Sequence, residues 1–333
     1  MRIPFETLQQ ELQRVLVKYG FTPERAHLSA RLFAETDLDG VYSHGINRFP
    51  RLIQYIQKGY VQPTAEPTIK AKLGNFEAWD GQLGPGNLNA YQAMDRAIAL
   101  AKKNGLGSVA LRNTNHWLRG GSYGWQAANA GCIGICFTNT MANMPPWGGT
   151  LPALGNNPFI MAVPQSAGKH VVLDMAMSQF SYGKLQTYTE AGKELPVPGG
   201  YNAAGELTRN ASEIQASERA LPIGFWKGAG LSLLLDLVAG MLAGGRTTAD
   251  INALPDEYGV SQVFICFDVN QMQDQSFTDN LIQNALNYLK ASPLVKPNEE
   301  ILYPGERVWH TRAENTRRGI PVDAKVWQQV QAM

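Results

Sequence analysis

The first sixty residues carry apolar side chains at the spacing of amphipathic helices. Between residues 4 and 20, hydrophobic positions recur every three or four residues, which predicts a helix with one buried face. A second helix is expected from Thr22 to Asp39, because threonine followed by proline is typical of a helix start and Asp39-Gly40 of a helix end. A third, shorter helix is expected over residues 50–58.

The pattern changes after residue 68. Residues 69–79 alternate in part between apolar and polar side chains and are interrupted by Gly74-Asn75, which predicts a β-hairpin. Helical patterns then alternate with apolar runs of strand length, an order that is typical of an α/β fold. Helices are expected over 88–104, 123–130, 229–243 and 277–290, and strands over 107–112, 133–138, 158–163, 170–175 and 261–269.

The length of the chain indicates two domains, because 333 residues are more than one hydrophobic core usually organises. The stretch from residue 276 to the C-terminus is mostly helical in pattern, and we expect it to pack back onto the N-terminal helices. We therefore predict a helical domain built from residues 1–68 plus 275–333, and a central α/β domain over residues 69–274.

Composition and charge favour a small-molecule partner. Lys and Arg number 29 against 28 Asp and Glu, so no overall field attracts nucleic acid or an anionic membrane. No run approaches the roughly 18 apolar residues of a membrane span, so no membrane contact is expected. The three cysteines, Cys132, Cys136 and Cys266, are an odd and sparse set, which predicts free buried thiols in the cytoplasm. For Cys132 and Cys136 we expect core packing rather than metal ligation, and no metal is expected.

The segment from Ser43 to Arg48 is the first candidate site, with His44 four residues before the arginine. Reduction of a carbonyl needs a proton at oxygen while hydride arrives at carbon, and histidine titrates near neutral pH. A guanidinium binds a carboxylate through two parallel hydrogen bonds, so Arg48 is a candidate anchor for a keto acid. A helix-capping histidine and a surface ion pair would fit the same spacing.

A second candidate site, Asn115-His116, lies in a segment that directly follows a predicted strand. Loops at strand ends often carry active-site residues. His116 is a candidate to hold a substrate carbonyl or hydroxyl, and Asn115 is a candidate hydrogen-bond donor to the substrate. A turn that is satisfied by its own asparagines is the alternative.

A third candidate, Trp226-Lys227-Gly228-Ala229-Gly230, precedes the predicted apolar helix. Glycines before a helix let backbone amides approach a phosphate, and Lys227 adds positive charge, so the segment is a candidate pyrophosphate or ribose site. A plain packing turn is the alternative. Residues 105–110 fit the dinucleotide pattern G-x-G-x-x-A, but they lead from a predicted helix into a strand, the reverse of the required order.

A serine hydrolase is the alternative from another class of enzyme. Residues 120–124 match the G-x-S-x-G nucleophile elbow, with Ser122 as nucleophile and Asp268 and His310 as partners in chain order. An elbow needs a tight turn from strand to helix. Here about seven loop residues separate the predicted end of the strand, near Arg112, from the motif, which disfavours this interpretation.

Six separated motifs, taken together, resemble the malate/L-lactate dehydrogenase family that lacks a Rossmann domain and also includes sulfolactate and ureidoglycolate dehydrogenases. They are YSHGINRFPR (42–51), NTNHWLRGGSYG (113–124), LGNNPF (154–159), VLDMAMSQFSYGK (172–184), GFWKGAGLSLLLD (224–236) and YPGE (303–306). The similarity covers nearly the whole chain. Two positions differ from residues that are frequent in the family, Asn156 in place of a threonine and Trp226 in place of a histidine.

The resemblance implies a homodimeric oxidoreductase that reduces a small keto acid with NADH, with NADPH as the alternative cofactor. Its fold would combine a three-layer, non-Rossmann NAD-binding domain around a mixed sheet with a helical domain formed by both termini. The resemblance makes His44 the proton donor and places Arg48 and His116 at the substrate. It implies the following dinucleotide contacts: His170, Val171, Val172, Leu173, Asp174, Met175, Ala176, Trp226, Lys227, Pro304, Gly305 and Glu306, with Asn156 and Pro158 nearby.

Overall fold

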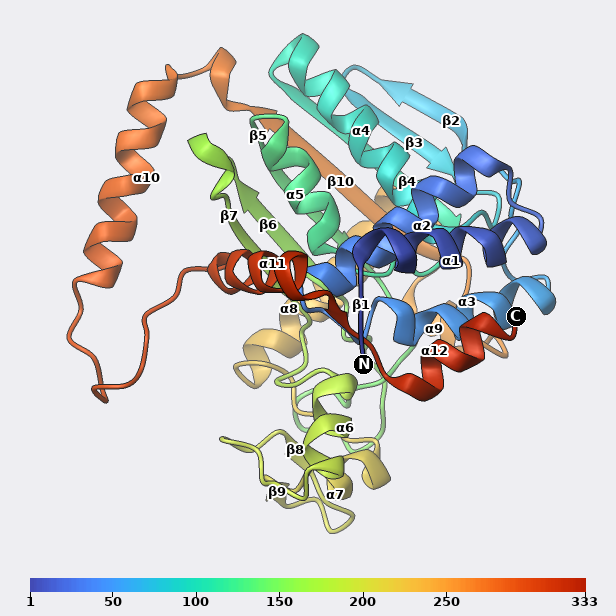
Figure 1. The fold of residues 1–333 in the computed structure, drawn as a ribbon, viewed down its shortest axis with the longest axis vertical. Coiled ribbons are helices and arrows are strands. Elements are labelled where there is room, and N and C mark those ends of the chain that lie inside the picture. The colour runs from blue at the N-terminus through green and yellow to red at the C-terminus, as the bar shows by residue number, and fades with distance from the viewer.

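The centre of the fold is a seven-stranded sheet with the order β2-β3-β4-β10-β5-β6-β7 (Figure 1). The computed structural model describes residues 1–333 apart from the side chain of Ala167. The strands β3 and β4 are parallel, and every other neighbouring pair is antiparallel, so the sheet is mixed, as expected. The bounds are β2 (Thr68–Leu73), β3 (Phe76–Asp80), β4 (Leu106–Thr114), β5 (Cys132–Thr138), β6 (Phe159–Val163), β7 (Val171–Met175) and β10 (Val260–Asp268).

Helices cover both faces of this sheet. The helices α4 (Gly86–Asn104) and α5 (Gly121–Asn129) pack on one face, and α8 (Trp226–Ala243) packs on the other. Successive side chains of a strand point to opposite faces, so β4 places Val109 and Leu111 in the first core and Ala110 in the second. The result is an α/β fold of three layers.

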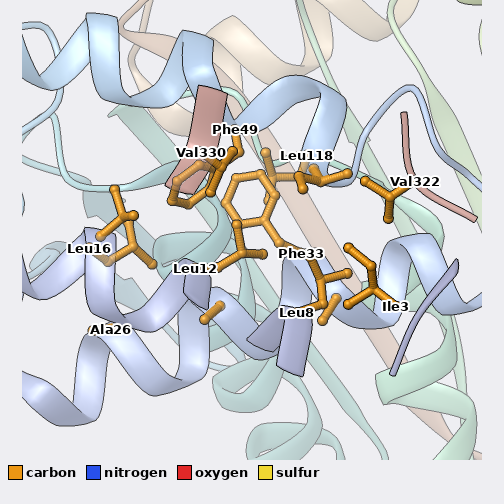
Figure 2. Packing of buried hydrophobic residues seen from close by; sticks show 14 of the residues in the cluster. Ile3, Leu8, Leu12, Leu16, Ala26, Phe33, Phe49, Leu118, Val322 and Val330 are labelled. Carbon is orange, nitrogen blue, oxygen red and sulfur yellow. The ribbon is translucent and has the colours of Figure 1, made fainter. Parts of the chain in front are cut away.

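The two ends of the chain meet beside this sheet. The short strand β1 (Arg2–Ile3) pairs with β11 (Ile320–Pro321), and their helices share one hydrophobic core (Figure 2). That core brings together Leu12, Phe33 and Phe49 with Val330 from the C-terminal end. The helices of this core are α1 (Phe5–Lys18), α2 (Pro23–Leu38), α3 (Phe49–Gln57) and α12 (Ala324–Gln331). The helix α11 (Glu306–Arg318) is attached to α2 by Asn315, whose side chain donates to the backbone oxygen of Leu38. The proposed division into two domains stays a prediction.

The helix α10 (Gln275–Lys290) differs from the other C-terminal helices in its packing. It lies away from the N-terminal helices, and the chain returns from it through a long connection to α11 (Figure 1). Ile282 is its one buried residue, and it lines a small hollow together with Ile133 and Val163. The amphipathic pattern predicted the helix itself but not the surface on which it lies.

Residues 180–225 form elements that the sequence did not predict. They comprise α6 (Tyr182–Glu190), β8 (Gly200–Tyr201), β9 (Leu207–Thr208) and α7 (Ala211–Ser217), around a small core that includes Leu185 and Ile214; α9 (Thr248–Asn252) follows later in the chain. Each of these elements is too short to show a clear hydrophobic period. The segment also contains few long apolar runs.

The start of α8 corrects a prediction. We expected a glycine loop before a helix at residue 229, but α8 begins at Trp226, so Gly228 and Gly230 lie within its first turns. A Cβ on Gly228 would come within 2.1 Å of the carbonyl oxygen of Ile223, so the glycine permits a close approach of backbone segments. α8 is also the helix that is long and apolar enough to cross a membrane, although its inner face packs against the sheet.

Candidate active site

A cavity of about 360 Å³ lies where the loop after α2, the loop after β4, the strand β7 and the start of α11 meet. It brings together residues that are far apart in the sequence. Of the residues predicted for substrate and cofactor, those that line it are His44, His116, Asn156, Pro158, Val172, Asp174, Ala176 and Gly305. The fold thus gathers most of the separate motifs around one space.

The imidazole rings of His44 and His116 face each other in this cavity. Their centroids are 5.9 Å apart and their planes differ by 23°. The backbone N–H of Leu118 donates to Nδ1 of His116 over 3.1 Å, so a neutral ring carries its proton on Nε2. Burial, reinforced by the charge of Arg48, holds the pKa of His116 well below its usual value. His116 is therefore a neutral hydrogen-bond donor.

His44 differs from His116 because it has an acidic neighbour. Burial lowers the pKa of His44, the carboxylate of Asp174 acts to raise it, and Arg48 lowers it further. Asp174 is held by the backbone N–H of Gly121 at 2.9 Å and lies 3.7 Å from Nε of Arg119. The hydroxyl of Ser43 lies 2.8 Å from Nδ1 of His44, which leaves Nε2 for a substrate. His44 is thus the histidine of the pair that is suited to change charge.

The loop that carries His44 is fixed by a buried carboxyl group. The backbone N–H of Ile46 donates to Oδ2 of Asp37 over 2.6 Å, and burial raises the pKa of Asp37 well above its usual value. A Cβ on Gly45 would lie 2.0 Å from Oδ1 of Asp37. Only glycine allows this approach, so Gly45 and Asp37 together set the position of the neighbouring histidine.

Arg48 lies in the 3₁₀ turn Ile46–Arg48 and acts on both histidines, because its charge lowers the pKa of each. Burial lowers the pKa of Arg48 itself, as does the charge of Arg51. Among the described residues, no carboxylate lies within salt-bridge distance of the Arg48 guanidinium. Its capacity for a paired contact with an acid therefore remains available.

Asn115, like Arg48, does not line the cavity. Its amide nitrogen donates to the backbone oxygens of Tyr60, Leu83 and Gly84 at 2.9–3.0 Å. The side chain is thereby used to anchor the surrounding loops. Its neighbour His116 is held in the cavity by the same turn.

The strand β7 presents its outer edge to the cavity. It is the last strand of the sheet, and the backbone N–H of Val172 donates outward to the oxygen of Pro304 over 2.9 Å. Gly305 has φ +93°, and a Cβ there would lie 3.1 Å from the nitrogen of Val172. A strand edge beside a glycine fits an extended nucleotide, whose phosphates and sugars can approach the backbone closely.

Both ring nitrogens of His170, at the start of this edge, lie within hydrogen-bond distance of other protein groups. Nδ1 accepts a hydrogen bond from the backbone N–H of Gln165 over 2.9 Å, and Nε2 lies 3.0 Å from Oδ1 of Asn129. Its burial lowers its pKa. The imidazole thus joins the turn before β7 to α5.

Trp226 and Lys227 lie beyond the other end of β7 and do not line the cavity. The backbone N–H of Ile223 donates to the oxygen of Met177 over 2.8 Å, which ties the segment before α8 to the chain that leaves β7. Trp226 is 64% exposed. The structure therefore does not bring Trp226 and Lys227 into the cavity that the other predicted cofactor residues line.

The residues of the predicted hydrolase triad are not joined to one another. Ser122 lies in the first turn of α5, Asp268 accepts from Lys102 at 2.8 Å and from Gln271 at 3.1 Å, and His310 lies on α11. No hydrogen bond links the three within the described part of the chain. The arrangement therefore does not favour nucleophilic catalysis by Ser122.

The cavity also contains residues that the sequence did not single out. They include Arg119, Thr140 and Glu257. Thr140 donates to Oδ1 of Asn156 over 3.2 Å, and Glu257 accepts from the backbone N–H of Met141 over 3.0 Å. Arg119 belongs to the motif NTNHWLRGGSYG (113–124). No motif in the sequence indicated that Glu257 lies in the cavity.

Comparison with known proteins gives a consistent family assignment. The sequence model described as malate/L-lactate dehydrogenase matches residues 3–331. The chain belongs to this family. It is therefore an oxidoreductase, as the resemblance of its motifs implied.

Individual relatives cover the whole chain. A protein of Citrobacter koseri named 2,3-diketo-L-gulonate reductase is 46% identical over 334 aligned positions, with full coverage of both chains. The crystal structure of malate dehydrogenase from Entamoeba histolytica matches with a TM-score of 0.93 at 25% identity, covering 100% of this chain and 96% of that one. Malate dehydrogenase from Pyrococcus horikoshii matches with a TM-score of 0.89 at 30% identity, covering 99% and 93%.

The first prediction concerns the charge balance at His44. Asp174→Asn removes the carboxylate that raises the pKa of His44, so that pKa should fall in the variant. The measurement is an NMR titration of the imidazole. Asp274→Asn, on the exposed start of α10, is the matched control and should leave the titration unchanged. An unaltered midpoint in Asp174→Asn would show that the carboxylate does not act on His44.

Proposed function

We propose that the protein reduces 2,3-diketo-L-gulonate to 3-dehydro-L-gulonate with NADH, and that His44 is the proton donor. The observation that carries this proposal is the pair of facing histidines, one neutral and one that shares its cavity with the carboxylate of Asp174, in a cavity bordered by β7. The name of the full-length relatives at 46% identity supports the substrate. Another 2-hydroxy acid of the malate, lactate or ureidoglycolate type is the alternative substrate in the same site.

Arg48, His116 and His44 have different roles in the reduction of the carbonyl. Arg48 binds the carboxylate of the keto acid through paired hydrogen bonds. His116 donates from Nε2 to the ketone oxygen, and protonated His44 passes its Nε2 proton to that oxygen as negative charge develops there. A reduced nicotinamide, when bound, supplies the hydride. Because this step needs the imidazolium, the rate of reduction falls as pH rises through the pKa of His44.

For the cofactor, we propose an extended dinucleotide along the outer edge of β7, in a domain that is not of the Rossmann type. The segments His170–Ala176 and Pro304–Glu306, together with Trp226-Lys227, are the proposed contacts. Asn156 and Pro158 support the nicotinamide end. NADH is the expected form, with NADPH as the alternative.

We also propose a cytoplasmic homodimer. The outer face of α8 exposes Leu233, Leu234, Leu237, Val238 and Met241, a continuous apolar surface of the kind that marks protein interfaces. A second copy of the chain is the proposed partner. The three cysteines are free and buried, which suits a reducing compartment.

Replacement of His44 tests the proton donor. His44→Ala should lower the turnover number for reduction about 10²- to 10⁴-fold, the usual contribution of general acid catalysis. The decrease of absorbance at 340 nm measures the rate of reduction. Fluorescence measures NADH binding, which should persist. His27→Ala, an exposed histidine on α2, is the control. A variant with normal turnover would exclude His44 as the donor.

Replacement of Arg48 tests the carboxylate anchor. Arg48→Lys keeps the charge but loses one of two parallel hydrogen bonds, so the Michaelis constant for the keto acid should rise about tenfold. Steady-state kinetics measure the constant, and Arg14→Lys in the exposed pair with Glu11 is the control. If the constant does not change, Arg48 does not hold the substrate.

A charge on the outer face of α8 tests the homodimer. Leu234 is 58% exposed, and Leu234→Asp should convert dimer to monomer because it places a carboxylate in an apolar interface. Light scattering after size exclusion measures the mass. Leu73→Asp on the exposed strand β2 should leave the dimer intact. A wild-type mass of one chain would contradict the proposed dimer.

A further inference from the structure

One acidic side chain in the cavity of the two histidines has no part in the proposed reduction. Glu257, three positions before the start of β10, lines this cavity together with His44 and His116. Oε2 of Glu257 accepts from the backbone N–H of Met141 over 3.0 Å. No hydrogen bond or salt bridge from a described residue occupies the other oxygen, so Oε1 is available to a ligand.

The two residues beside Glu257 fix the position of its backbone. The carboxylate of Asp256 accepts from Nζ of Lys58 over 2.6 Å. Tyr258 stacks on Tyr60, with ring centroids 4.5 Å apart and planes that differ by 11°. Both contacts join this segment to the end of α3 and the loop that follows, so the backbone that carries Glu257 is held on both sides.

Glu257 and Arg48 are close enough for their charges to interact. Burial and the charge of Arg51 lower the pKa of Arg48, and the carboxylate of Glu257 opposes this effect. The two side chains form no salt bridge with each other in the described structure. Arg48 can therefore bind the acid end of a substrate while Glu257 contacts a more distant part of the same molecule.

The cavity wall offers no cation to a second anionic group. Among the described residues that line it, Arg119 is the only lysine or arginine, and its guanidinium is bound to Asp39. Outside the wall, Arg51 donates from Nε and Nη2 to the hydroxyl of Tyr55. A second carboxylate near Glu257 would thus meet like charge without compensation, which weakens binding strongly.

Hydroxyl groups suit this position instead. An ionised carboxylate only accepts hydrogen bonds, and a hydroxyl group donates one without bringing charge. The hydroxyl groups of Thr138 and Thr140 do not fill this role, because they donate to other groups of the protein. The far end of 2,3-diketo-L-gulonate carries hydroxyl groups, whereas that of oxaloacetate is a carboxylate and that of pyruvate is a methyl group.

We propose that Glu257 determines the choice of substrate: it binds the hydroxyl groups at the far end of a polyhydroxylated keto acid and rejects keto acids with a second anionic group. This inference rests on the proposed function, since it assumes a keto acid that is held by Arg48 with its ketone beside His44. It separates the proposed substrate from the malate type of alternative, which Arg48 and the two histidines treat alike.

Glu257→Gln tests the inference with three keto acids. The variant keeps the size of the side chain and an oxygen for the N–H of Met141, but it loses the charge. For 2,3-diketo-L-gulonate, kcat/KM should fall about 10- to 150-fold, the factor for one hydrogen bond to a charged group. For oxaloacetate it should rise by about tenfold or more, because the like charge is removed, and for pyruvate it should change little. Absorbance at 340 nm measures each rate, and an acid that is not reduced is compared through its inhibition constant against 2,3-diketo-L-gulonate.

Two further variants separate charge from structure. Glu257→Asp keeps the charge on a shorter side chain, so it should still reject oxaloacetate while it binds 2,3-diketo-L-gulonate more weakly. Glu24→Gln, the same change in the exposed first turn of α2, is the matched control and should leave the constants for all three acids unaltered.

A change of equal size and direction for all three acids in Glu257→Gln, or no change, would overturn the inference. A wild-type enzyme that reduces oxaloacetate as well as 2,3-diketo-L-gulonate would do the same. Either result would leave an NADH-dependent reductase of keto acids standing. A folded wild-type enzyme that reduces none of the three acids would instead refute the proposed function.

Discussion

The carboxylate of Asp39 joins the segments on which the active site depends. From the end of α2 it accepts hydrogen bonds from Arg119, in the loop after β4, and from Arg312 of α11, the latter over 2.5 Å. Both Asp39 and Arg119 are almost fully buried. Loss of one partner from a buried ion pair typically costs about 3–5 kcal/mol, because the remaining charge is left without compensation.

Asp39 connects the loop of His44 with the strand β7. Asp39 lies five positions before His44 in the chain, and Arg119 also approaches Asp174. The loop of His44, the carboxylate of Asp174 and the helix α11 are therefore connected through Asp39 and Arg119. Arg119 lines the cavity of the two histidines, and Asp39 and Arg312 line a second cavity between α2, α5 and α11.

Much of the fold could be predicted because its long elements have a clear hydrophobic period. The strands of the main sheet and the helices α4, α5 and α10 lie within a few residues of their predicted bounds. The segment from residue 180 to 225 could not be predicted, because its elements are short and are stabilised by contacts with one another. The position of α10 was also missed, since an apolar face does not identify the surface it covers.

The candidate site was predictable to a similar degree. His44, Arg48 and His116 have side chains whose chemistry is visible in the sequence, and the fold places the two histidines face to face. The internal roles of Asn115 and His170 depend on backbone groups and side chains from distant segments, which no local pattern reveals. The balance of charge at His44 likewise depends on Asp174, which lies 130 positions later in the chain.

The segment that borders β7 also has a bearing on how the molecule avoids self-association. An uncovered edge strand is a template on which strands of other chains can assemble into aggregates. Pro304 accepts the outward hydrogen bond of Val172 but has no N–H of its own to continue a ladder, and Gly305, with φ +93°, turns the chain away at once. Pro304 and Gly305 thus end the sheet and prevent β7 from pairing with a strand of a neighbouring molecule.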